Sequence, residues 1–239
     1  MDQDAKKQAL SKAWADAEAS GATLFEQLDR YAGASRQIIP DVLASYDRMV
    51  ARLIQGEAGT TAPSVGDEMP DVLLPDSGGH LIALSTLWAN RPLVVSFNRG
   101  HWCPYCRLEL HALKHAAAQI EFAGARLVSI VPETAEFSSK MIETNALPFR
   151  VLSDIDHAYA LELGLTVWTG PEIGAVYVGF GIDLARFQSS TTGMLPIPAT
   201  FVIAPGGRIS ARFVDPEFRH RMPIEDILAA LTGVGQSRP

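Results

Sequence analysis

The chain has 239 residues, of which 47% are hydrophobic, and it carries a formal net charge of -7. This composition is that of a folded protein with a substantial core, and its acidity argues against a nucleic-acid surface, which requires clustered Lys and Arg. The N-terminus lacks the apolar segment of a signal peptide, and no stretch approaches the roughly 20 apolar residues that span a bilayer. We therefore expect a cytoplasmic protein with no nucleic-acid partner and no membrane partner.

The first 55 residues carry three amphipathic patterns, in which apolar residues recur at helical spacing and which are separated by Gly21 and Pro40. The next stretch, residues 55–70, is rich in Gly, Pro and small polar residues, which is the composition of a linker. We therefore predict a helical N-terminal extension with its linker at residues 1–62 and a main domain at residues 63–239. The apolar stripes of the extension must pack against the main domain or against a second copy, and the sequence leaves both options open.

The main domain alternates between strand and helix patterns. Two short apolar runs flank the turn residues 76–79 as a hairpin, and the β-branched run at residues 92–97 predicts a central parallel strand. One helical face of apolar residues follows at 104–122, and a further strand at 125–131 completes a strand, helix, strand unit.

The same alternation continues towards the C-terminus. We predict, in chain order, a helix at 134–145, a strand at 149–152, a helix at 156–163, a hairpin of strands at 199–204 and 209–214, and a last helix that has Pro223 at its first position and ends at Gly233. The sum is an α/β fold in which helices flank a central mixed sheet.

Both cysteines lie in the segment Trp102-Cys103-Pro104-Tyr105-Cys106, between a predicted strand and a predicted helix. Pro104 suits the first helical position, so Cys103 is expected at the N-cap and Cys106 one turn inside the helix. The positive end of the helix dipole stabilises a thiolate there, and a Cys-X-X-Cys arrangement lowers a thiol pKa of about 8.5 by one to several units. One sulfur is then a nucleophile at neutral pH, and the other can close a disulfide with it.

Two other interpretations of the pair stay open on these residues. Free cysteine is among the most buried residue types, so both side chains could be inert apolar fillers. His101, Cys103, Cys106 and His111 could also be counted as four zinc ligands, although structural zinc normally draws on two separated ligand pairs. The order strand, Cys-X-X-Cys, helix favours redox chemistry over both, and we expect no resident metal or cofactor.

Four segments of the main domain occur in the order of a known family: "VGDEMPDVLLPDSGG", "VVSFNRGHWCPYCRLEL", "VLSD" and "PATFVIAPGGRI". The chain thereby resembles the alkyl hydroperoxide reductase and thiol-specific antioxidant group, the peroxiredoxin-like branch of the thioredoxin-fold superfamily. The resemblance covers residues 63–232 and implies a thioredoxin-like fold.

Peroxiredoxins usually carry Pro, then Thr-X-X-Cys, then Glu three residues later, and Arg99, Cys103, Cys106 and Glu109 occupy those places here. Cys106 thus matches the peroxide-attacking cysteine of the family. Cys103, in the place of the threonine, matches the attacking cysteine of thioredoxins and glutaredoxins. The resemblance to peroxiredoxins implies that Cys106 attacks the peroxide and that Cys103 resolves the product.

Four residues are assigned supporting roles. Arg99 is expected to lower a thiolate pKa or hold a peroxide oxygen, and Trp102 to shield the sulfurs. Glu109 is expected to move a proton or to pair with a nearby base. Pro198 stands where peroxiredoxins have an activating arginine and thioredoxins a cis-proline, so the resemblance implies a cis bond between Ile197 and Pro198.

Two further segments carry weaker expectations. The basic spot at Arg219, His220 and Arg221 is expected to be a solvated surface. The aromatic-rich segment 165–195 is an insertion, and we expect it to overhang the sulfurs and restrict substrates.

The function that these residues predict is that of a peroxiredoxin-like antioxidant peroxidase, which reduces hydrogen peroxide or organic hydroperoxides through a Cys103/Cys106 dithiol-disulfide cycle. An external thiol of the thioredoxin, glutaredoxin or glutathione type would reduce the disulfide, and the resemblance also implies a homodimer. The alternative is a protein disulfide reductase with Cys103 as the nucleophile, which the missing threonine and arginine favour. A non-catalytic binding protein on the same fold is the third interpretation.

Overall fold

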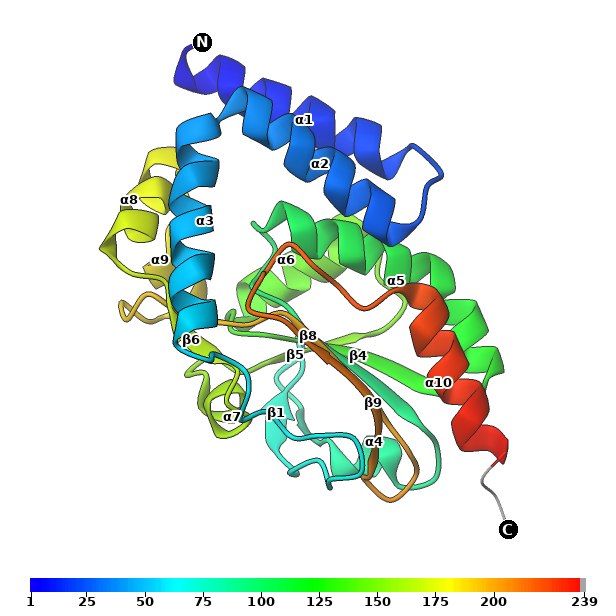
Figure 1. Ribbon diagram of the computed structural model, residues 1–239. Coiled ribbons are helices and arrows are strands. Elements are labelled where there is room, and N and C mark those ends of the chain that lie inside the picture. The colour runs from blue at the N-terminus through cyan, green and yellow to red at the C-terminus, as the bar shows by residue number, and fades with distance from the viewer. Residues whose placement is uncertain (237–239) are drawn as a thin grey trace.

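The computed structural model describes residues 1–236 (Figure 1). The helices are α1 (Gln3–Glu18), α2 (Leu24–Ile38), α3 (Pro40–Gln55), α4 (Ser85–Trp88), α5 (Pro104–Phe122), α6 (Ala135–Asn145), α7 (Ala158–Glu162), α8 (Pro171–Phe180), α9 (Leu184–Gln188) and α10 (Ile224–Gln236). The strands are β1 (Leu73–Pro75), β2 (Leu81–Ala83), β3 (Leu93–Phe97), β4 (Arg126–Val131), β5 (Arg150–Ser153), β6 (Thr166–Trp168), β7 (Met194–Pro196), β8 (Ala199–Ile203) and β9 (Ile209–Val214). The predicted α/β fold is confirmed.

The central sheet has five strands in the order β5-β4-β3-β8-β9. β3 and β5 both pair in parallel with β4, whereas β8 pairs antiparallel with β3 and with β9. Phe97, the last residue of β3, stands opposite Ala199, the first residue of β8. The C-terminal end of β3 and the N-terminal end of β8 therefore lie side by side at one end of the sheet. The segment with the cysteines begins at this end.

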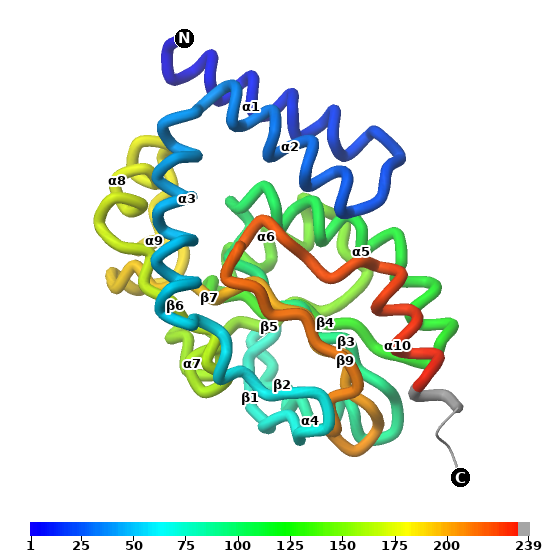
Figure 2. The backbone as a smooth tube through the Cα atoms, in the orientation of Figure 1, coloured from blue at the N-terminus to red at the C-terminus, as the bar shows by residue number. Residues whose placement is uncertain are grey.

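Alternate side chains of β3 pack on opposite faces of the sheet, as the period of two requires. Val94 packs in a cluster with Leu113 of α5 and Ile227 of α10, and these two helices lie side by side in Figure 2. Val95 packs on the other face in a cluster with Tyr159 of α7, to which β1, α4 and the ends of β8 also contribute. Both faces are covered, which explains why the β3 sequence is continuously apolar.

The N-terminal extension packs on the main domain of its own chain. α1 and α2 form an antiparallel pair that contacts α5, and α3 runs beside α8 (Figure 1). Thr23 opens α2 with a capping box, and Pro40 opens α3. Leu28 and Tyr31 of α2 join the same buried cluster as Cys103. The apolar stripe of α2 is therefore buried against the helix that carries the cysteines.

Two details of the predicted elements are wrong. The last helix, α10, begins after Pro223 and continues past Gly233, since a single helical glycine costs only about 1 kcal/mol and does not by itself end a helix. Residues 1–236 contain no cis peptide bond, so the bond before Pro198 is trans. The Ile197 N–H donates to the carbonyl of Leu165 at 2.7 Å, so the chain runs extended from β7 into β8.

None of the helices within residues 1–236 is long and apolar enough to cross a membrane.

Candidate active site

The cysteines stand where a tight loop after β3 turns into α5. Gly100 has a φ of 137°, and a Cβ there would lie 2.6 Å from the Glu133 carboxylate and from the indole nitrogen of Trp102, so the loop requires glycine. Cys103 is the N-cap of α5 and Pro104 its first helical residue. The predicted start of the helix is confirmed, and it places both sulfurs at the positive end of the helix dipole.

The two sulfurs have different surroundings. Both residues are free thiols and both are buried, Cys103 with 1% and Cys106 with 0% of its surface exposed. The Cys106 sulfur accepts hydrogen bonds from the Arg99 backbone N–H at 3.4 Å and from Nη2 of Arg221 at 3.3 Å. The Cys103 side chain instead lines a pocket, which Cys106 does not reach. Cys103 is therefore the cysteine that borders the pocket, and the Cys106 sulfur is held by buried donors.

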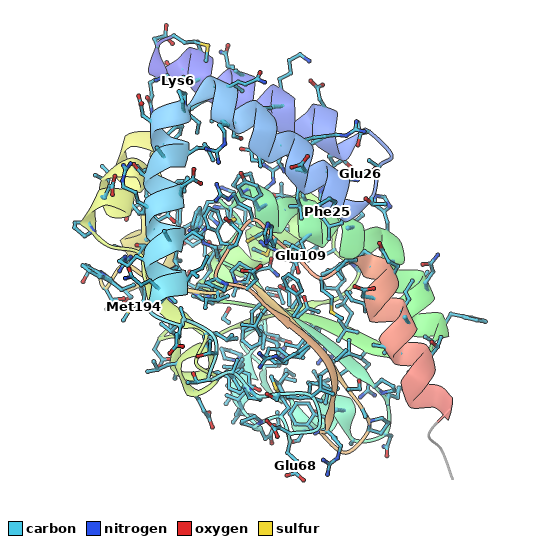
Figure 3. All side chains as sticks on the ribbon, viewed as in Figure 1. Lys6, Phe25, Glu26, Glu68, Glu109 and Met194 are labelled. Atoms are coloured by element: carbon cyan, nitrogen blue, oxygen red, sulfur yellow. The ribbon has the colours of Figure 1, made fainter. Side chains whose placement is uncertain are left out.

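Arg221 belongs to a buried ion pair. Its Nε donates to the Glu109 carboxylate, and the two side chains are 1% and 3% exposed. Its Nη1 donates to the carbonyls of Phe218 and His220, both at 2.6 Å. Glu109 of α5, which Figure 3 labels in the interior, also accepts from the Ser96 hydroxyl at 2.9 Å. Of the two roles predicted for Glu109, the structure contains the pairing with a base.

Arg99 is buried without a carboxylate. The residue is 3% exposed and donates to the hydroxyl of Tyr177. Its guanidinium lies 4.3 Å from the ring centre of Phe218 and 5.3 Å from that of Trp102. No ion pair joins it to an Asp or Glu within the part of the chain that the structure describes. Its charge is therefore left for the sulfurs to balance.

The charges of this cluster favour one thiolate. Two buried arginines and one buried carboxylate leave a single positive charge uncompensated. Burial opposes ionisation of Cys103, but hydrogen bonding with the Cys106 thiol and the charges of Arg99 and Arg221 outweigh it and lower the Cys103 pKa to about 6. Burial, together with the hydrogen bond and the charge of Cys103, raises the pKa of Cys106 well above its ordinary value. The two shifts run in opposite directions, and together they favour a single thiolate, on Cys103.

The pocket in front of Cys103 has a volume of about 290 Å³. The extension, the cysteine loop and the insertion all contribute to its wall, with Trp14 and Tyr46 from the extension, Trp102 from the loop and Phe180 from α8. Its lining combines these aromatic rings with basic side chains and contains no Asp or Glu. A small molecule with an apolar body can therefore reach Cys103 there.

The insertion lies over the cysteines, as predicted. Segment 165–195 supplies β6, α8, α9 and β7, none of which the sequence patterns predict. Tyr177 of α8 contacts Arg99, and its ring packs edge-on against that of Trp102 with centroids 5.1 Å apart. The effect of this cover on substrates stays a prediction.

The remaining two predicted site residues, Trp102 and Pro198, lie in different places. Trp102 stands between the cysteine loop and α8, where it also lines the pocket. Pro198 borders a small interior space together with Arg99 and Phe218, and is not in the wall of the Cys103 pocket.

The basic spot before α10 is not the solvated surface that the sequence predicts. His220 is exposed and pairs with Asp215, but the Arg219 side chain is only 11% exposed and binds Asp47 and Glu217. Arg221 is buried beside Cys106. Sequence reasoning missed Arg221 because 115 residues separate it from the cysteine, and the one available signal was its place in a segment that resembles the family.

The two histidines considered as zinc ligands have other partners. His101 Nδ1 lies 2.6 Å from the Glu133 carboxylate, and the two ring nitrogens of His111 lie 3.2 Å from oxygens of Glu18 and Asn145. Residues 1–236 contain no group of three or more His, Cys, Asp or Glu side chains arranged to hold a metal ion.

Curated proteins with similar sequences include peroxiredoxins. The chain is 29% identical over 103 residues to "Peroxiredoxin Bcp" from Escherichia coli, an alignment that covers 43% of this chain and 64% of that protein. It is also 29% identical over 92 residues to "Thioredoxin-like protein AAED1, chloroplastic" from Arabidopsis thaliana, over 38% of this chain and 37% of that protein. The chain thus matches less than two thirds of the length of either relative.

Solved structures support the fold. "Peroxidoxin BcpB" from Mycobacterium tuberculosis superposes with a TM-score of 0.56 at 21% identity, over 73% of this chain and 98% of that one. A yeast mitochondrial 1-Cys peroxiredoxin superposes with a TM-score of 0.58 at 15% identity, over 73% of this chain and 78% of that one. At such identities the likeness shows the thioredoxin-like fold alone. The sequence model of the AhpC/TSA family, however, matches residues 65–212, more than half of the chain, and the protein therefore belongs to the AhpC/TSA family.

Proposed function

We propose that the protein is a thiol peroxidase that cycles Cys103 and Cys106 between a dithiol and a disulfide. The observation that carries the proposal is the pair of adjacent buried cysteines beside Arg99, a buried arginine with no carboxylate partner within residues 1–236. A stabilised thiolate is the form of cysteine that attacks a peroxide. Membership of the AhpC/TSA family supports peroxide as the substrate.

Cys103 is the attacking residue in this proposal. It lines the pocket, and its pKa is lowered to about 6, whereas Cys106 is fully enclosed and its pKa is raised. A peroxide that enters through the pocket meets the Cys103 sulfur first. This order reverses the one implied by the family position of Cys106.

The reaction proceeds in two steps. The Cys103 thiolate attacks the terminal peroxide oxygen, the O–O bond breaks, and the departing alkoxide or hydroxide takes the proton of the Cys106 thiol. Cys103 is then a sulfenic acid, and Cys106 is a thiolate. Its sulfur attacks the Cys103 sulfur, the S–O bond breaks and hydroxide leaves to the solvent, and a disulfide remains. Arg99 and Arg221 stabilise the negative charge that passes between the sulfurs.

Single-turnover mixing of the Cys103→Ser and Cys106→Ser variants with hydrogen peroxide tests this order. We expect Cys103→Ser to lose the fast phase by about 100-fold or more, because the thiolate is the nucleophile. Cys106→Ser should still be oxidised but stop at a sulfenic acid, which dimedone labelling and mass spectrometry detect. Fast oxidation of Cys103→Ser together with an inert Cys106→Ser would instead support the order implied by the family.

Protein disulfide reduction is the second candidate function, because a low pKa on the first cysteine of a CPYC motif also suits that reaction. The burial of both sulfurs disfavours it, since a protein disulfide must touch the attacking sulfur. Insulin reduction and peroxide consumption measured on the same sample separate the two. Insulin turnover that exceeds peroxide turnover would favour the reductase.

A further inference from the structure

The pocket in front of Cys103 is a cationic site inside an acidic protein. Lys7 of α1, Arg99 of the cysteine loop and Arg107 of α5 all line it. None of the three has an ion pair to Asp or Glu within residues 1–236, although the chain as a whole carries a net charge of -7. Arg107 stacks on the ring of Trp14 at 4.0 Å, which leaves its charge unneutralised. Such a site attracts anions.

The charge of this site depends on the redox state of the cysteines. In the dithiol form the Cys103 thiolate balances Arg99, and it repels any anion in the pocket. A disulfide carries no charge, so Arg99 loses its partner when the disulfide forms. An anion therefore binds more tightly to the disulfide form than to the dithiol form, and it is released once the thiolate returns.

We propose that this pocket binds the reductant of the disulfide, and that this reductant is a small thiol carrying carboxylates. The inference rests on the proposed dithiol-disulfide cycle. The pocket volume of about 290 Å³ is near the small end of the roughly 300–1,000 Å³ typical of small-molecule sites. Aromatic walls accept the body of such a molecule, and the basic side chains of Lys7 and Arg107 in the same lining accept its carboxylates.

A protein reductant fits this site poorly. Disulfide exchange requires the incoming sulfur to touch the sulfur that it attacks, and only Cys103 of the pair lines the pocket. A hydrogen bond holds α1 against the Cys-X-X-Cys segment, because the Trp14 indole donates to the Pro104 carbonyl at 3.0 Å. The route to Cys103 therefore admits a small molecule and excludes a protein surface.

The exchange balances with two molecules of thiol. The first thiolate attacks Cys103 and forms a mixed disulfide with it, and Cys106 leaves as a thiolate that takes a proton. A second thiolate attacks the sulfur of the bound thiol, so that the small-molecule disulfide leaves and the Cys103 thiolate returns. Two small thiols are oxidised and one protein disulfide is reduced.

The first experiment compares two probes that differ in charge. Full-length protein is oxidised with one equivalent of hydrogen peroxide, and the disulfide is verified by mass spectrometry. Glutathione, which carries two carboxylates, and its diethyl ester, in which both carboxylates are masked, are then compared at equal thiolate concentration. We expect glutathione to react about tenfold faster at low ionic strength, with an advantage that shrinks as salt is added. Equal rates for the two probes overturn the inference, whereas failure to form the disulfide overturns the proposed function instead.

A second experiment removes the charges of the pocket. In the double variant Lys7→Gln/Arg107→Gln, the ratio of the glutathione rate to the ester rate should fall to within about twofold of unity. Lys12→Gln is the matched control, because Lys12 lies on the same helix, pairs with Asp16 and does not line the pocket. The control should keep the full ratio. An unchanged ratio in the double variant, or an equal loss in the control, overturns the inference.

Two further arms exclude other occupants. Reduction by a thioredoxin-type protein that is faster than reduction by glutathione at equal thiol concentration would overturn the assignment to a small thiol. The second arm compares the rates at which the reduced protein reacts with a carboxylate-bearing and with a neutral hydroperoxide. A charge preference found in this reaction, and not in the reaction with thiols, would assign the pocket to the peroxide and would overturn the inference.

Discussion

Two arginines flank the cysteine pair, and they differ in what balances their charge. Arg221, beside Cys106, is paired with the buried carboxylate of Glu109. Arg99, at the pocket, has no carboxylate partner within residues 1–236 and lies against aromatic rings and the Tyr177 hydroxyl. A buried charge without a partner is costly, so Arg99 requires an anion, and the Cys103 thiolate is the one at hand. The region behind the pair is thus built for stability and the region in front for chemistry.

The largest expected effect is on stability, and it tests the ion pair of Arg221 and Glu109 beside Cys106. Replacement Arg221→Met strands the Glu109 charge in the interior and should lower the free energy of unfolding by about 3–5 kcal/mol in urea titrations. Adding Glu109→Gln to the same chain should restore most of the loss, because no charge is then stranded. Arg36→Gln, which removes a pair whose arginine is 54% exposed, is the control and should cost less than about 1 kcal/mol. If Arg221→Met lowers the free energy of unfolding no more than the control does, the ion pair of Arg221 and Glu109 does not stabilise the fold.

The next largest effect is on the reactivity of Cys103, and it tests the charge of Arg99. Arg99→Gln should raise the pKa of Cys103 from about 6 towards its ordinary value, because Arg99 is one of the charges that lower it. At pH 7 the rate of alkylation by iodoacetamide should therefore fall about tenfold.

The same variant should be less destabilised than Arg221→Met, since it strands no carboxylate. Alkylation rates measured from pH 5 to pH 9 give the pKa directly. A midpoint that does not move in Arg99→Gln would remove the distinction between the two arginines.

Local signals allowed most of the fold to be predicted. Pro104 and the apolar face that follows it define α5 within one stretch of sequence, and the start of that helix fixes both cysteines. The elements of the insertion were not predicted, because their helices are short and β6 pairs with β7 from the far end of the segment.

The electrostatics of the site could not be predicted from local patterns. Arg221 reaches Cys106 across 115 residues, and a basic residue among basic neighbours looks solvated until the fold buries it. The cis bond expected at Pro198 came from resemblance to thioredoxins, and the pairing of β7 with β6 gives the chain a different path there. Contacts between distant segments, rather than residue types, decide both cases.

A smaller effect tests whether the N-terminal extension limits access to Cys103. Trp14→Ala removes the hydrogen bond to the Pro104 carbonyl and the stacking on Arg107, and should cost about 1–2 kcal/mol of stability. Cys103 should then react faster with a bulky maleimide, because α1 no longer holds the cover closed. Trp14→Phe keeps the ring and loses only the hydrogen bond, so its effect should be about half as large. Identical maleimide rates in all three proteins would mean that α1 does not limit access.

The last effect, which is spread over several pH units, is the dependence of stability on pH in the reduced protein. Cys103 has a pKa of about 6 in the folded chain and an ordinary value of about 8.5 when unfolded, so folding favours its ionised form. Its contribution is complete above the unfolded value and is lost as the pH falls through 6. Cys106 acts in the opposite sense, because its raised pKa makes the fold less stable as the pH rises beyond the ordinary value.

Stability should therefore increase between pH 6 and about pH 8.5 by up to about 3 kcal/mol, and then decrease. Cys103→Ser should abolish the increase, and Cys106→Ser should keep a smaller one, because hydrogen bonding with Cys106 is among the causes that lower the Cys103 pKa. Urea titrations across this range in the presence of a phosphine reductant measure the effect. An increase that survives in Cys103→Ser and vanishes in Cys106→Ser would place the thiolate on the sulfur beside Arg221, and the contrast between the two arginines would then have to be inverted.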